Sequence, residues 1–280
     1  MLIAESGSTK TAWRLLDKTG LKASFQSPGI NPNVLEQEVI EDIFRTAFGS
    51  HLASLDLDEL HFYGAGIGSD SQKGIIRGIL QKILPRTNIY VEHDILAAAR
   101  STRRDEGIIC ILGTGSNSAS HRSYELLESL GGHGYIFGDE GSGMDLGKNL
   151  IKGILQGDFP DEARQYVEEH KGKTAYDIKI SIHHSSKPNV RMAELAQMVG
   201  GLIHLPAMQA MVLERFKAFL DATVVRYPNY KNLHVDFVGS VAFFFQKQLE
   251  EACASRGAKL GSIVKDPVDN LVQYHLEKML

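Results

Sequence analysis

The amino-acid sequence predicts an α/β protein with two lobes. Short apolar strands alternate with amphipathic helices almost throughout, which is the pattern of a largely enclosed sheet. The chain has 280 residues, 43% of them hydrophobic, and is therefore long enough to fill two moderate cores. Its second half also opens as the first does, with an apolar strand, a polar turn that contains glycine, and a returning strand. We therefore expect a duplicated unit.

The elements of the first half follow from the spacing of apolar residues and from the turn residues between them. Pro85 ends one helical pattern, because proline lacks the amide hydrogen that a helix interior needs. The predicted order is strands at 2–4 and 12–16, a loop at 27–33, a helix at 35–48, a strand at 61–63, a glycine-rich turn at 64–68, a helix at 74–84, a strand at 89–92 and a helix at 95–101.

A charged stretch at 103–107 interrupts the apolar pattern, and we place the lobe boundary there, with lobes of residues 1–105 and 106–280. Whether the last helix packs back on the first lobe stays open. The predicted order in the second half is a strand at 108–112, a turn at 113–116, a returning strand at 117–120, helical regions at 145–170 and 192–225 joined by an exposed connection at 171–189, a strand at 233–238 that runs into a helix, and a helical tail at 268–280.

Composition and charge exclude several classes of function. A net charge of -4 and a pI near 6.3 provide no basic face for the phosphates of nucleic acid. The apolar run 235–245 contains Asp236 and is too short to cross a bilayer, and residues 1–4 lack the basic start of a secretion signal. We expect a cytoplasmic protein that binds neither nucleic acid nor a membrane.

Cysteine and histidine give no strong sign of a metal site. Cys110 and Cys253 stand far apart in apolar segments, without a CxxC neighbour, so we expect buried thiols and no clustered zinc site. The connection at 171–189 carries His183 and His184, which we interpret as solvated because no third ligand stands nearby.

The polar turn between the first two predicted strands, Glu5 to Thr11, is a candidate phosphate-binding loop. The backbone amides and hydroxyls of Gly7, Ser8 and Thr9 can donate to a polyphosphate. Lys10 can add positive charge, and Glu5 can hold a hydrated Mg²⁺. An ordinary polar hairpin is the alternative interpretation. The loop is not a Walker motif, since no GxxxxGK[ST] pattern occurs and a strand follows in place of a helix.

Two more glycine turns stand at the ends of predicted strands. The strand at 108–112 runs into Gly113-Thr114-Gly115-Ser116, a second hydroxyl-bearing turn that could clamp the same triphosphate. Gly239 and Ser240 stand where a strand passes into a helix, which allows a ligand close to the backbone, and adenosine is the candidate ligand there. Three such turns together favour nucleotide binding more than any one of them does.

These motifs resemble those of the sugar kinase/heat-shock chaperone/actin superfamily, and within it the N-acetylglucosamine kinases and the BadF/BadG-type ATPases. The resemblance covers nearly the whole chain. It is carried by the loops at 5–11, 113–116 and 239–242, by Glu92-His93-Asp94, and most specifically by the glycine-rich segments 131–134 and 138–143. It implies two lobes of duplicated ribonuclease H-like, actin-like ATPase topology, βββαβαβα, with an interlobe cleft.

The resemblance also implies an activity. An enzyme of this kind transfers the γ-phosphate of ATP, with Mg²⁺, to the 6-hydroxyl of N-acetylglucosamine or a related amino sugar, and it works as a homodimer. Asp94 matches the aspartate that takes the proton from the sugar hydroxyl, although a helix cap is the alternative role for an aspartate there. The residues that match sugar-binding positions are Asn31, Gly66, Asp94, Gly132, Asp139 and Glu140. Asn31 as a turn residue, and Asp139 with Glu140 as a solvated loop tip, are the alternatives.

The sequence departs from the family pattern in its first loop and in its tail. The family loop begins Asp-Gly-Gly, whereas this chain has Glu5-Ser6-Gly7, and the segment 266–270 matches the family only loosely. Two other functions stay open. An ATP-driven activator of a radical dehydratase would need paired cysteines for an iron-sulfur cluster, and Cys110 lies in an apolar strand where a cluster has no room. A nucleotide-gated interaction protein is also compatible with the fold.

Overall fold

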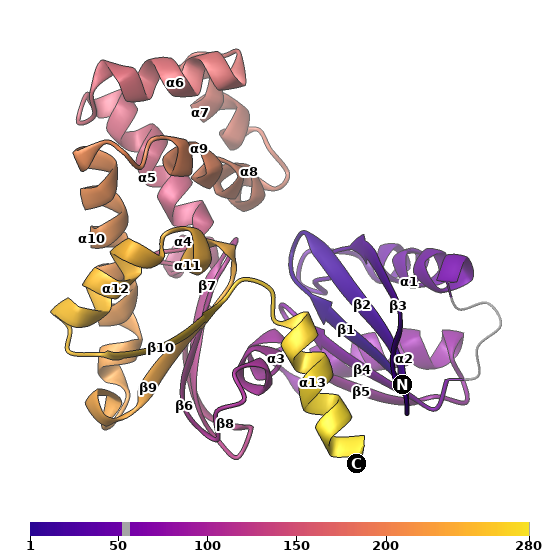
Figure 1. Ribbon diagram of the computed structural model, residues 1–280. Coiled ribbons are helices and arrows are strands. Elements are labelled where there is room, and N and C mark those ends of the chain that lie inside the picture. The colour runs from indigo at the N-terminus through magenta and orange to yellow at the C-terminus, as the bar shows by residue number, and fades with distance from the viewer. Residues whose placement is uncertain (52–56, 280) are drawn as a thin grey trace. The chain divides into compact units, whose positions relative to one another are not determined.

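The computed structural model describes residues 1–51 and 57–279 (Figure 1). The chain forms two compact units: unit 1 comprises Met1–Arg104 and Pro267–Leu280, and unit 2 comprises Asp105–Asp266. The chain passes from unit 1 to unit 2 one residue before the boundary that the sequence predicted. The tail, whose lobe the sequence left open, belongs to unit 1.

Unit 1 is built on a sheet with the strand order β3-β2-β1-β4-β5. Strand β1 pairs antiparallel with β2 and parallel with β4, and β4 pairs parallel with β5. This is the predicted βββαβαβα order. The elements are β1 (Leu2–Ser6), β2 (Lys10–Asp17), β3 (Gly20–Pro28), α1 (Gln37–His51), β4 (Glu59–Gly64), α2 (Asp70–Ile83), β5 (Asn88–His93), α3 (Asp94–Ser101) and α13 (Val268–Met279).

Unit 2 repeats the same sheet, with the strand order β10-β9-β6-β7-β8. The antiparallel strands β6, β7 and β8 correspond to β1, β2 and β3, and β9 and β10 continue in parallel beside β6. The elements are β6 (Glu106–Leu112), β7 (Ser116–Arg122), β8 (Glu125–Gly131), α4 (Gly134–Phe137), α5 (Gly143–Gln156), α6 (Asp161–Lys171), α7 (Ala175–His183), α8 (Pro188–Glu194), α9 (Ala196–Gly201), α10 (Pro206–Ala222), β9 (His234–Val238), α11 (Ser240–Phe244), α12 (Gln246–Ser255) and β10 (Lys259–Val264).

The duplicated two-lobe α/β fold is therefore confirmed, while several element-level predictions were wrong. Strands β3, β8 and β10 were missed, because most of their side chains are exposed or half-buried and apolar residues do not alternate along them. The segment 171–189 was predicted as an exposed connection, but it contains the helix α7, whose N-cap is Thr174. The region at 145–170 is helical, as predicted, and it consists of α5 and α6 because Gly157 adopts a left-handed conformation (φ 77°) that ends α5.

Aromatic packing dominates the core of unit 1. The Trp13 ring stacks on Phe25 with centroids 5.7 Å apart, and Phe48 of α1 meets it edge-on at 5.3 Å. Helices α1 and α2 pack together on this side of the sheet, while α3 and α13 pack against each other and against β1. Since buried aromatic side chains contribute large apolar areas, this cluster holds the strands of unit 1 in their register.

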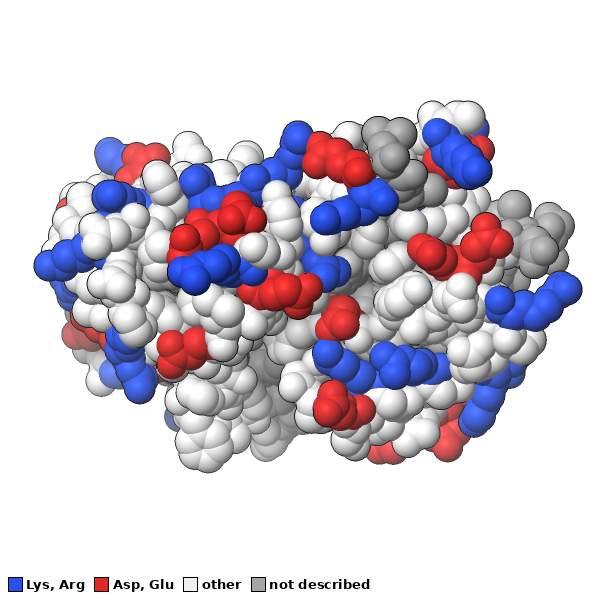
Figure 2. Space-filling view, turned by 90° about the horizontal axis from the view of Figure 1, so that it is seen from below, with Lys and Arg blue, Asp and Glu red and all other residues white. Residues whose placement is uncertain are grey.

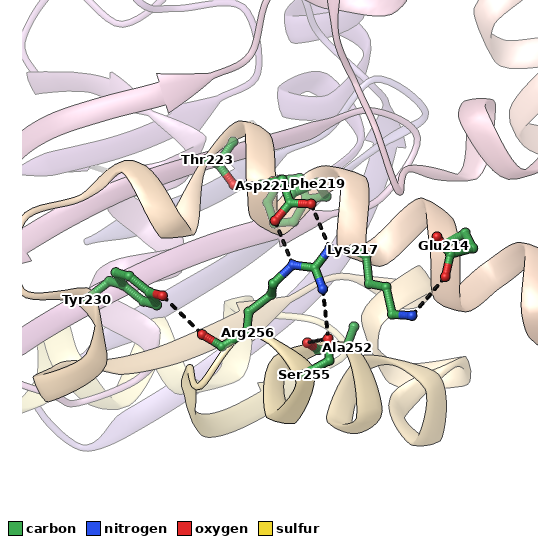
Figure 3. A network of polar contacts seen from close by, with 9 residues as sticks. All are labelled: Glu214, Lys217, Phe219, Asp221, Thr223, Tyr230, Ala252, Ser255 and Arg256. Carbon is green, nitrogen blue, oxygen red and sulfur yellow. Dashed lines mark hydrogen bonds and ion pairs between the residues drawn. The ribbon is translucent and has the colours of Figure 1, made fainter.

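The core of unit 2 is larger and joins β6 and β9 to the helices α5, α10 and α12. Figure 3 shows the polar contacts that join the end of α12 to α10. The Arg256 guanidinium donates from Nε to Asp221 Oδ1 at 2.6 Å and from Nη2 to Asp221 Oδ2 at 2.7 Å, and the Tyr230 hydroxyl donates to the Arg256 carbonyl at 3.0 Å. This two-bond pair fixes the end of α12 beside α10.

Charged residues of both signs are distributed over the surface. On the face shown in Figure 2, Lys and Arg side chains alternate with Asp and Glu side chains. Within residues 1–51 and 57–279, no helix has both the length and the apolar character needed to cross a bilayer.

Candidate active site

The parallel strands of unit 1 bring three candidate segments to one edge of the sheet. Ser6 at the end of β1 pairs with Gly64 at the end of β4, and Gly64 pairs with His93 at the end of β5. The residues that follow these three strands are the loop 7–9, the turn that contains Gly66, and Asp94. Carboxyl ends of parallel strands are where open α/β sheets bind ligands. The strand register thus places the candidate phosphate loop, a candidate sugar residue and the candidate base side by side.

Buried hydroxyls support the first candidate phosphate loop from below. Ile30 N–H donates to Ser6 Oγ at 3.0 Å, the Ser6 and Thr11 hydroxyls are 2.7 Å apart, and Thr11 donates to the Pro28 carbonyl at 3.0 Å. Ser6 and Thr11 are fully buried, whereas Ser8, Thr9 and Lys10 are exposed. The buried hydroxyls are therefore structural, and the exposed tip is the part that a ligand can reach.

The loop also depends on a glycine that sequence reasoning did not single out. A Cβ atom at Gly29 would lie 2.4 Å from the Gly7 carbonyl oxygen and 2.6 Å from the Ser8 carbonyl carbon. Gly29 N–H donates to the Thr9 carbonyl at 3.1 Å. Only glycine fits this close approach of two backbones. The SPGINPN segment carried the signal, since it has a glycine next to a proline two residues before Asn31.

The candidate sugar residues Asn31 and Gly66 are in contact. A Cβ at Gly66, where φ is 74°, would lie 2.1 Å from Asn31 Oδ1, so no other residue type fits there. Asn31 Oδ1 accepts from Asn33 N–H at 2.9 Å, and Asn33 Nδ2 donates to the Gly66 carbonyl at 3.1 Å. Gln72 of α2 donates to Asn33 Oδ1 and also completes a capping box with Ser69. Asn33 and Gln72 thus hold the Asn31 turn in place, and the sequence analysis had assigned neither of them a role.

Asp94 is the first residue of α3. The alternative role for Asp94, as the cap of this helix, was wrong, because the cap is the preceding residue. The cap of α3 is His93, whose Nδ1 accepts from Ile95 N–H at 3.2 Å. Asp94 Oδ1 is shielded from solvent and lies 2.6 Å from the same His93 Nδ1. One ring nitrogen cannot donate to the carboxylate and accept from the backbone at once. When Nδ1 carries a proton it pairs with Asp94, and when it does not it caps the helix.

The environment of His93 stabilises the protonated, paired form relative to a solvated histidine. Burial lowers the pKa of His93, but the hydrogen bond that His93 donates to Asp94 and the negative charge of Asp94 outweigh burial, and the pKa of His93 is raised above its usual value. Lys73 lowers the pKa of His93 and Glu92 raises it, each to a smaller extent. The protonated ring thus holds the Asp94 carboxylate beside His93 Nδ1.

In unit 2, the second candidate phosphate loop is tied to the GDEGSG segment, residues 138–143. Ser116 N–H donates to Asp139 Oδ1 at 3.0 Å, and Gly143 N–H donates to the Gly113 carbonyl at 2.8 Å. A Cβ at Gly115 would lie 3.1 Å from both Asp139 carboxylate oxygens. Burial raises the pKa of Asp139, and the nearby Glu140 adds to this, against the bond from Ser116. Asp139 is therefore part of the loop structure and is not a freely solvated loop tip.

A buried ion pair anchors the same segment. Asp145, only 2% exposed, accepts from Gly141 N–H at 3.0 Å and from Arg215 Nε at 2.6 Å. Asn149 and Lys148 also contact Asp145 Oδ1, at 3.0 and 3.3 Å. Because a buried carboxylate is costly without such partners, these contacts fix how α5 begins. Sequence reasoning did not assign a role to Asp145, and only the neighbouring motif pointed to it.

The remaining candidates lie at turns of unit 2. Gly132, with φ 68°, approaches Asn117, whose Oδ1 would be 2.9 Å from a Cβ there. Gly239, with φ 124°, lies against the Leu112 carbonyl, which would be 2.3 Å from a Cβ, and Ser240 begins α11. The end of β9 is therefore held against the start of the second phosphate loop. Glu140 is half-buried beside Gly138.

A pocket of about 670 Å³ also lies in unit 2, between α4, α5, α7 and α8. Its basic lining residues are Lys148, Lys152, Lys179 and His183, and the lining that the structure describes includes no carboxylate. Tyr135 of α4 completes one wall and stands in the chain between the candidate sugar residues Gly132 and Asp139. The volume is within the range of small-molecule sites.

Glu5 is the one candidate metal ligand. It is half-buried at the end of β1, and no three Asp, Glu, His or Cys side chains come together as a metal site in the described part of the chain. Mg²⁺ in nucleotide enzymes is commonly held by one or two carboxylates together with phosphate oxygens and water. A single carboxylate beside a phosphate loop fits that donor set.

Both thiols are buried in unit 2, as the sequence predicted. Burial raises the pKa of Cys110 well above its usual value and that of Cys253 to about 12. Because a cysteine ligates metal as the thiolate, neither side chain is prepared for an iron-sulfur cluster.

Comparisons with known proteins identify relatives of this chain. The chain is 31% identical over 208 residues, 70% of this chain and 68% of the relative, to the N-acetylmuramic acid/N-acetylglucosamine kinase of Clostridium acetobutylicum. A crystal structure of a Porphyromonas gingivalis protein proposed to be an N-acetylglucosamine kinase matches it with a TM-score of 0.92 and 35% identity over all of both chains.

A more distant structure shows the fold alone. The ROK family glucokinase of Streptomyces griseus superposes with a TM-score of 0.58 at 13% identity, covering 98% of this chain and 97% of that one. The model of the BadF/BadG/BcrA/BcrD ATPase family matches residues 5–158, more than half of the chain. This span contains both candidate phosphate loops, Asp94 and the segment 138–143. The chain belongs to the BadF/BadG/BcrA/BcrD ATPase family.

Proposed function

We propose that this protein is an ATP-dependent kinase that transfers the γ-phosphate to the 6-hydroxyl of N-acetylglucosamine or a related amino sugar. The observation that carries the proposal is the single sheet edge in unit 1 where the loop 7–10, the Asn31–Gly66 turn and Asp94 follow three paired strands. Phosphoryl transfer asks mainly for positioning and charge stabilisation, with one carboxylate near the attacking hydroxyl. That edge offers each of these.

Each residue has a role in this proposal. Asp94 accepts the proton of the 6-hydroxyl, while Asn31 and the backbone at Gly66 orient the sugar. The amides and hydroxyls of Gly7, Ser8 and Thr9 and the charge of Lys10 bind the ATP phosphates. When bound, Mg²⁺ neutralises phosphate charge, and Glu5 is the residue that would hold it. The phosphate-binding role is supported by the exposure of residues 8–10, which stand on the buried, hydrogen-bonded pair Ser6 and Thr11.

Unit 2 supplies the complementary groups. The turn Gly113-Thr114-Gly115-Ser116 binds phosphate, and the backbone at Gly239 and Ser240 contacts adenosine. Asp139, Glu140 and the backbone at Gly132 bind sugar hydroxyls. The tight contacts at Gly239 and Gly115, where a Cβ would meet Leu112 and Asp139, favour this because such crowding fixes backbone donors before a ligand arrives.

The experiment is a coupled ATPase and phosphotransfer assay on the purified protein. Asp94→Asn should lower kcat for sugar phosphorylation by about 10²- to 10⁴-fold and leave ATP affinity unchanged. Asp70→Asn is the matched control, because Asp70 is likewise the first residue of a helix, α2. Undiminished turnover in Asp94→Asn would overturn the assignment of Asp94. Absence of sugar-dependent ATP consumption in the unaltered protein would overturn the kinase itself.

The same assay identifies the acceptor. The screen covers glucose, glucosamine, N-acetylglucosamine, N-acetylmannosamine and N-acetylmuramic acid, with product analysed by NMR for the position of the phosphate. The carboxylate-bearing sugar belongs in the screen because Lys148, Lys152 and Lys179 line the pocket beside α4. A homodimer and a cytoplasmic location complete the proposal from the family resemblance, and light scattering on the purified protein tests the dimer.

An iron-sulfur activator of a dehydratase is not proposed. The buried thiols of Cys110 and Cys253 argue against it, because their raised pKa values keep them protonated. Protein purified under anaerobic conditions should contain no stoichiometric iron.

A further inference from the structure

The pocket of about 670 Å³ in unit 2 is lined by faces of three helices. The lining that the structure describes contains none of the residues that we propose to bind ATP or sugar. Helices α7 and α8 pack on α5 (Figure 1). The residues that α5 contributes are Lys148, Ile151, Lys152 and Leu155, which are three or four positions apart and therefore share one face of the helix. Helix α7 contributes a face of the same spacing.

One part of this lining is apolar. Ile151 of α5 is 5% exposed and belongs to the core of unit 2, and Ile182 of α7 packs against the same core. Leu155 also lines the pocket but stays 43% exposed, and Met192 of α8 is half-buried beside it in the lining. Apolar side chains that line a concave site and still contact water gain free energy when an apolar ligand covers them.

The lysines of the same faces make the pocket positive. Lys148 contacts Asp145 Oδ1 at 3.3 Å, but Asp145 also accepts from Arg215 Nε at 2.6 Å, so this one carboxylate lies between two cations. The negative charge of Asp145 is therefore already balanced without Lys148.

Lys152 and Lys179 have no acidic partner nearby. Neither has an Asp or Glu three or four residues away on its own helix, and within residues 105–266, all of which the structure describes, neither forms an ion pair. The ammonium group of Lys179 lies 4.9 Å from the centre of the Tyr176 ring, which carries no net charge. A pocket with two such cations and no carboxylate in its described lining favours an anionic ligand.

An alternative interpretation needs no ligand. A lysine stem can cover apolar surface while its ammonium group stays in water, and three lysines on amphipathic helices can do only that. The two interpretations differ in one measurable respect, since only a binding site saturates with a ligand that is both anionic and apolar.

We propose that this pocket binds an amphipathic carboxylate, an anionic head on an unbranched apolar chain, as a ligand separate from ATP and sugar. Lys152 and Lys179 donate to the carboxylate from two different helices. The apolar chain lies against Leu155, Ile182 and Met192. The volume is within the range of small-molecule sites, about 300–1,000 Å³. A sugar suits these walls less, because its hydroxyls would lose water against apolar side chains without gaining hydrogen bonds.

The test measures binding of acetate, butyrate, hexanoate and octanoate to the whole chain by calorimetry, at constant ionic strength set with chloride. One octanoate per chain should bind saturably, with millimolar or tighter affinity. Each methylene removed should weaken binding about two- to fourfold, because less apolar surface is covered. The uncharged 1-hexanol should bind about tenfold more weakly than hexanoate, because it forms no ion pair with the lysines.

Variants locate this binding in the pocket. Lys152→Gln and Lys179→Gln should each weaken octanoate about three- to fivefold, and the double variant Lys152→Glu/Lys179→Glu should abolish binding. Leu155→Gln, at an exposed position that tolerates a polar side chain, should weaken octanoate more than butyrate. Lys247→Gln is the matched control, because Lys247 is an exposed lysine of α12 outside the pocket lining.

Three results would overturn the proposal: octanoate that does not saturate, 1-hexanol that binds as tightly as hexanoate, or a double variant that is folded by circular dichroism and binds octanoate like the unaltered protein. N-acetylmuramic acid should not displace octanoate. Displacement would show that the pocket is part of the sugar site, and a separate ligand would then be wrong. Because binding is measured directly, none of these results depends on kinase activity.

Discussion

At the scale of single residues, the candidate site contains a pair of adjacent ionisable groups, His93 and Asp94. His93 Nδ1 is shared between Ile95 N–H, at 3.2 Å, and Asp94 Oδ1, at 2.6 Å. Its raised pKa means that protonated His93 stabilises the fold below about pH 6.5, and this contribution is lost as pH rises through the raised pKa of the folded state. The same proton ties Asp94 Oδ1 to His93 Nδ1.

A pH profile of the His93→Asn variant tests this coupling. In the unaltered protein kcat should rise as pH passes upward through the pKa of His93, because loss of the Nδ1 proton frees Asp94 Oδ1 from its hydrogen bond with His93 and leaves it available to the sugar hydroxyl. Asparagine keeps a cap for α3 but does not titrate, so the variant should lose that rising limb while its free energy of unfolding changes by less than about 1 kcal/mol. The measurement is steady-state kcat between about pH 6 and 9. An identical profile in the variant would contradict the coupling.

At the scale of elements, the β1–β2 turn requires close contact between two backbone segments, whereas the exposed face of α2 has space for an added Cβ atom. At Gly29 a Cβ would strike the backbone of Gly7 and Ser8 at 2.4 and 2.6 Å, so the loop would have to move. At Gly78, within α2, a Cβ would meet nothing within 4 Å. Substitution by alanine should therefore have opposite effects on stability at these two glycines.

We expect Gly29→Ala to lower stability by about 1–3 kcal/mol and to weaken ATP binding, because backbone atoms cannot yield as a flexible side chain can. Gly78→Ala should raise stability by up to about 1 kcal/mol, because alanine is the better helix former. Urea titrations of both variants and ATP affinity by calorimetry check these outcomes. If Gly29→Ala binds ATP like the unaltered protein, the loop 7–9 is not the rigid phosphate site that we propose.

For the molecule as a whole, the chain closes unit 1 with its own last helix. α13 packs on α3 and β2, with Leu271 fully buried and Val272 5% exposed. Arg14 of β2 pairs with Asp269 at 2.9 Å, and Arg103 pairs with Glu277. Unit 2, by contrast, draws all of its core from residues 105–266.

Leu271→Ala should therefore lower the free energy of unfolding of unit 1 by about 2–5 kcal/mol, the usual cost of emptying a buried leucine site. Val39→Ala, at an apolar residue of α1 that is 45% exposed, is the control and should have little effect. Hydrogen exchange resolves the two units: protection should fall in α3 and β4 and stay unchanged in β6 and β9. Equal loss of protection in both units would show that the tail does not belong to unit 1 alone.

The sequence by itself determined the duplicated α/β fold, the glycine turns and the identity of the candidate residues. Apolar periodicity marks β1, β6 and β9 because their side chains are buried, and Gly113 and Gly239 stand out because turns and close approaches need glycine. Strands β3 and β8 left no such mark, since a strand with mostly exposed side chains is identified by its pairing alone.

Only the tertiary structure decided which residues meet. In the sequence Gly29 is only a turn residue next to a proline, and the structure shows that it lies against the backbone of Gly7. Asp145 is likewise one aspartate of a predicted helix, and the structure shows its contact at 2.6 Å with Arg215, seventy residues later. The tail likewise joined unit 1 because Leu271 and His275 find buried partners on α3 and β4 there. Local pattern records the environment of each residue along its own element. Contacts between distant segments depend on strand register and packing, which no single stretch of sequence contains.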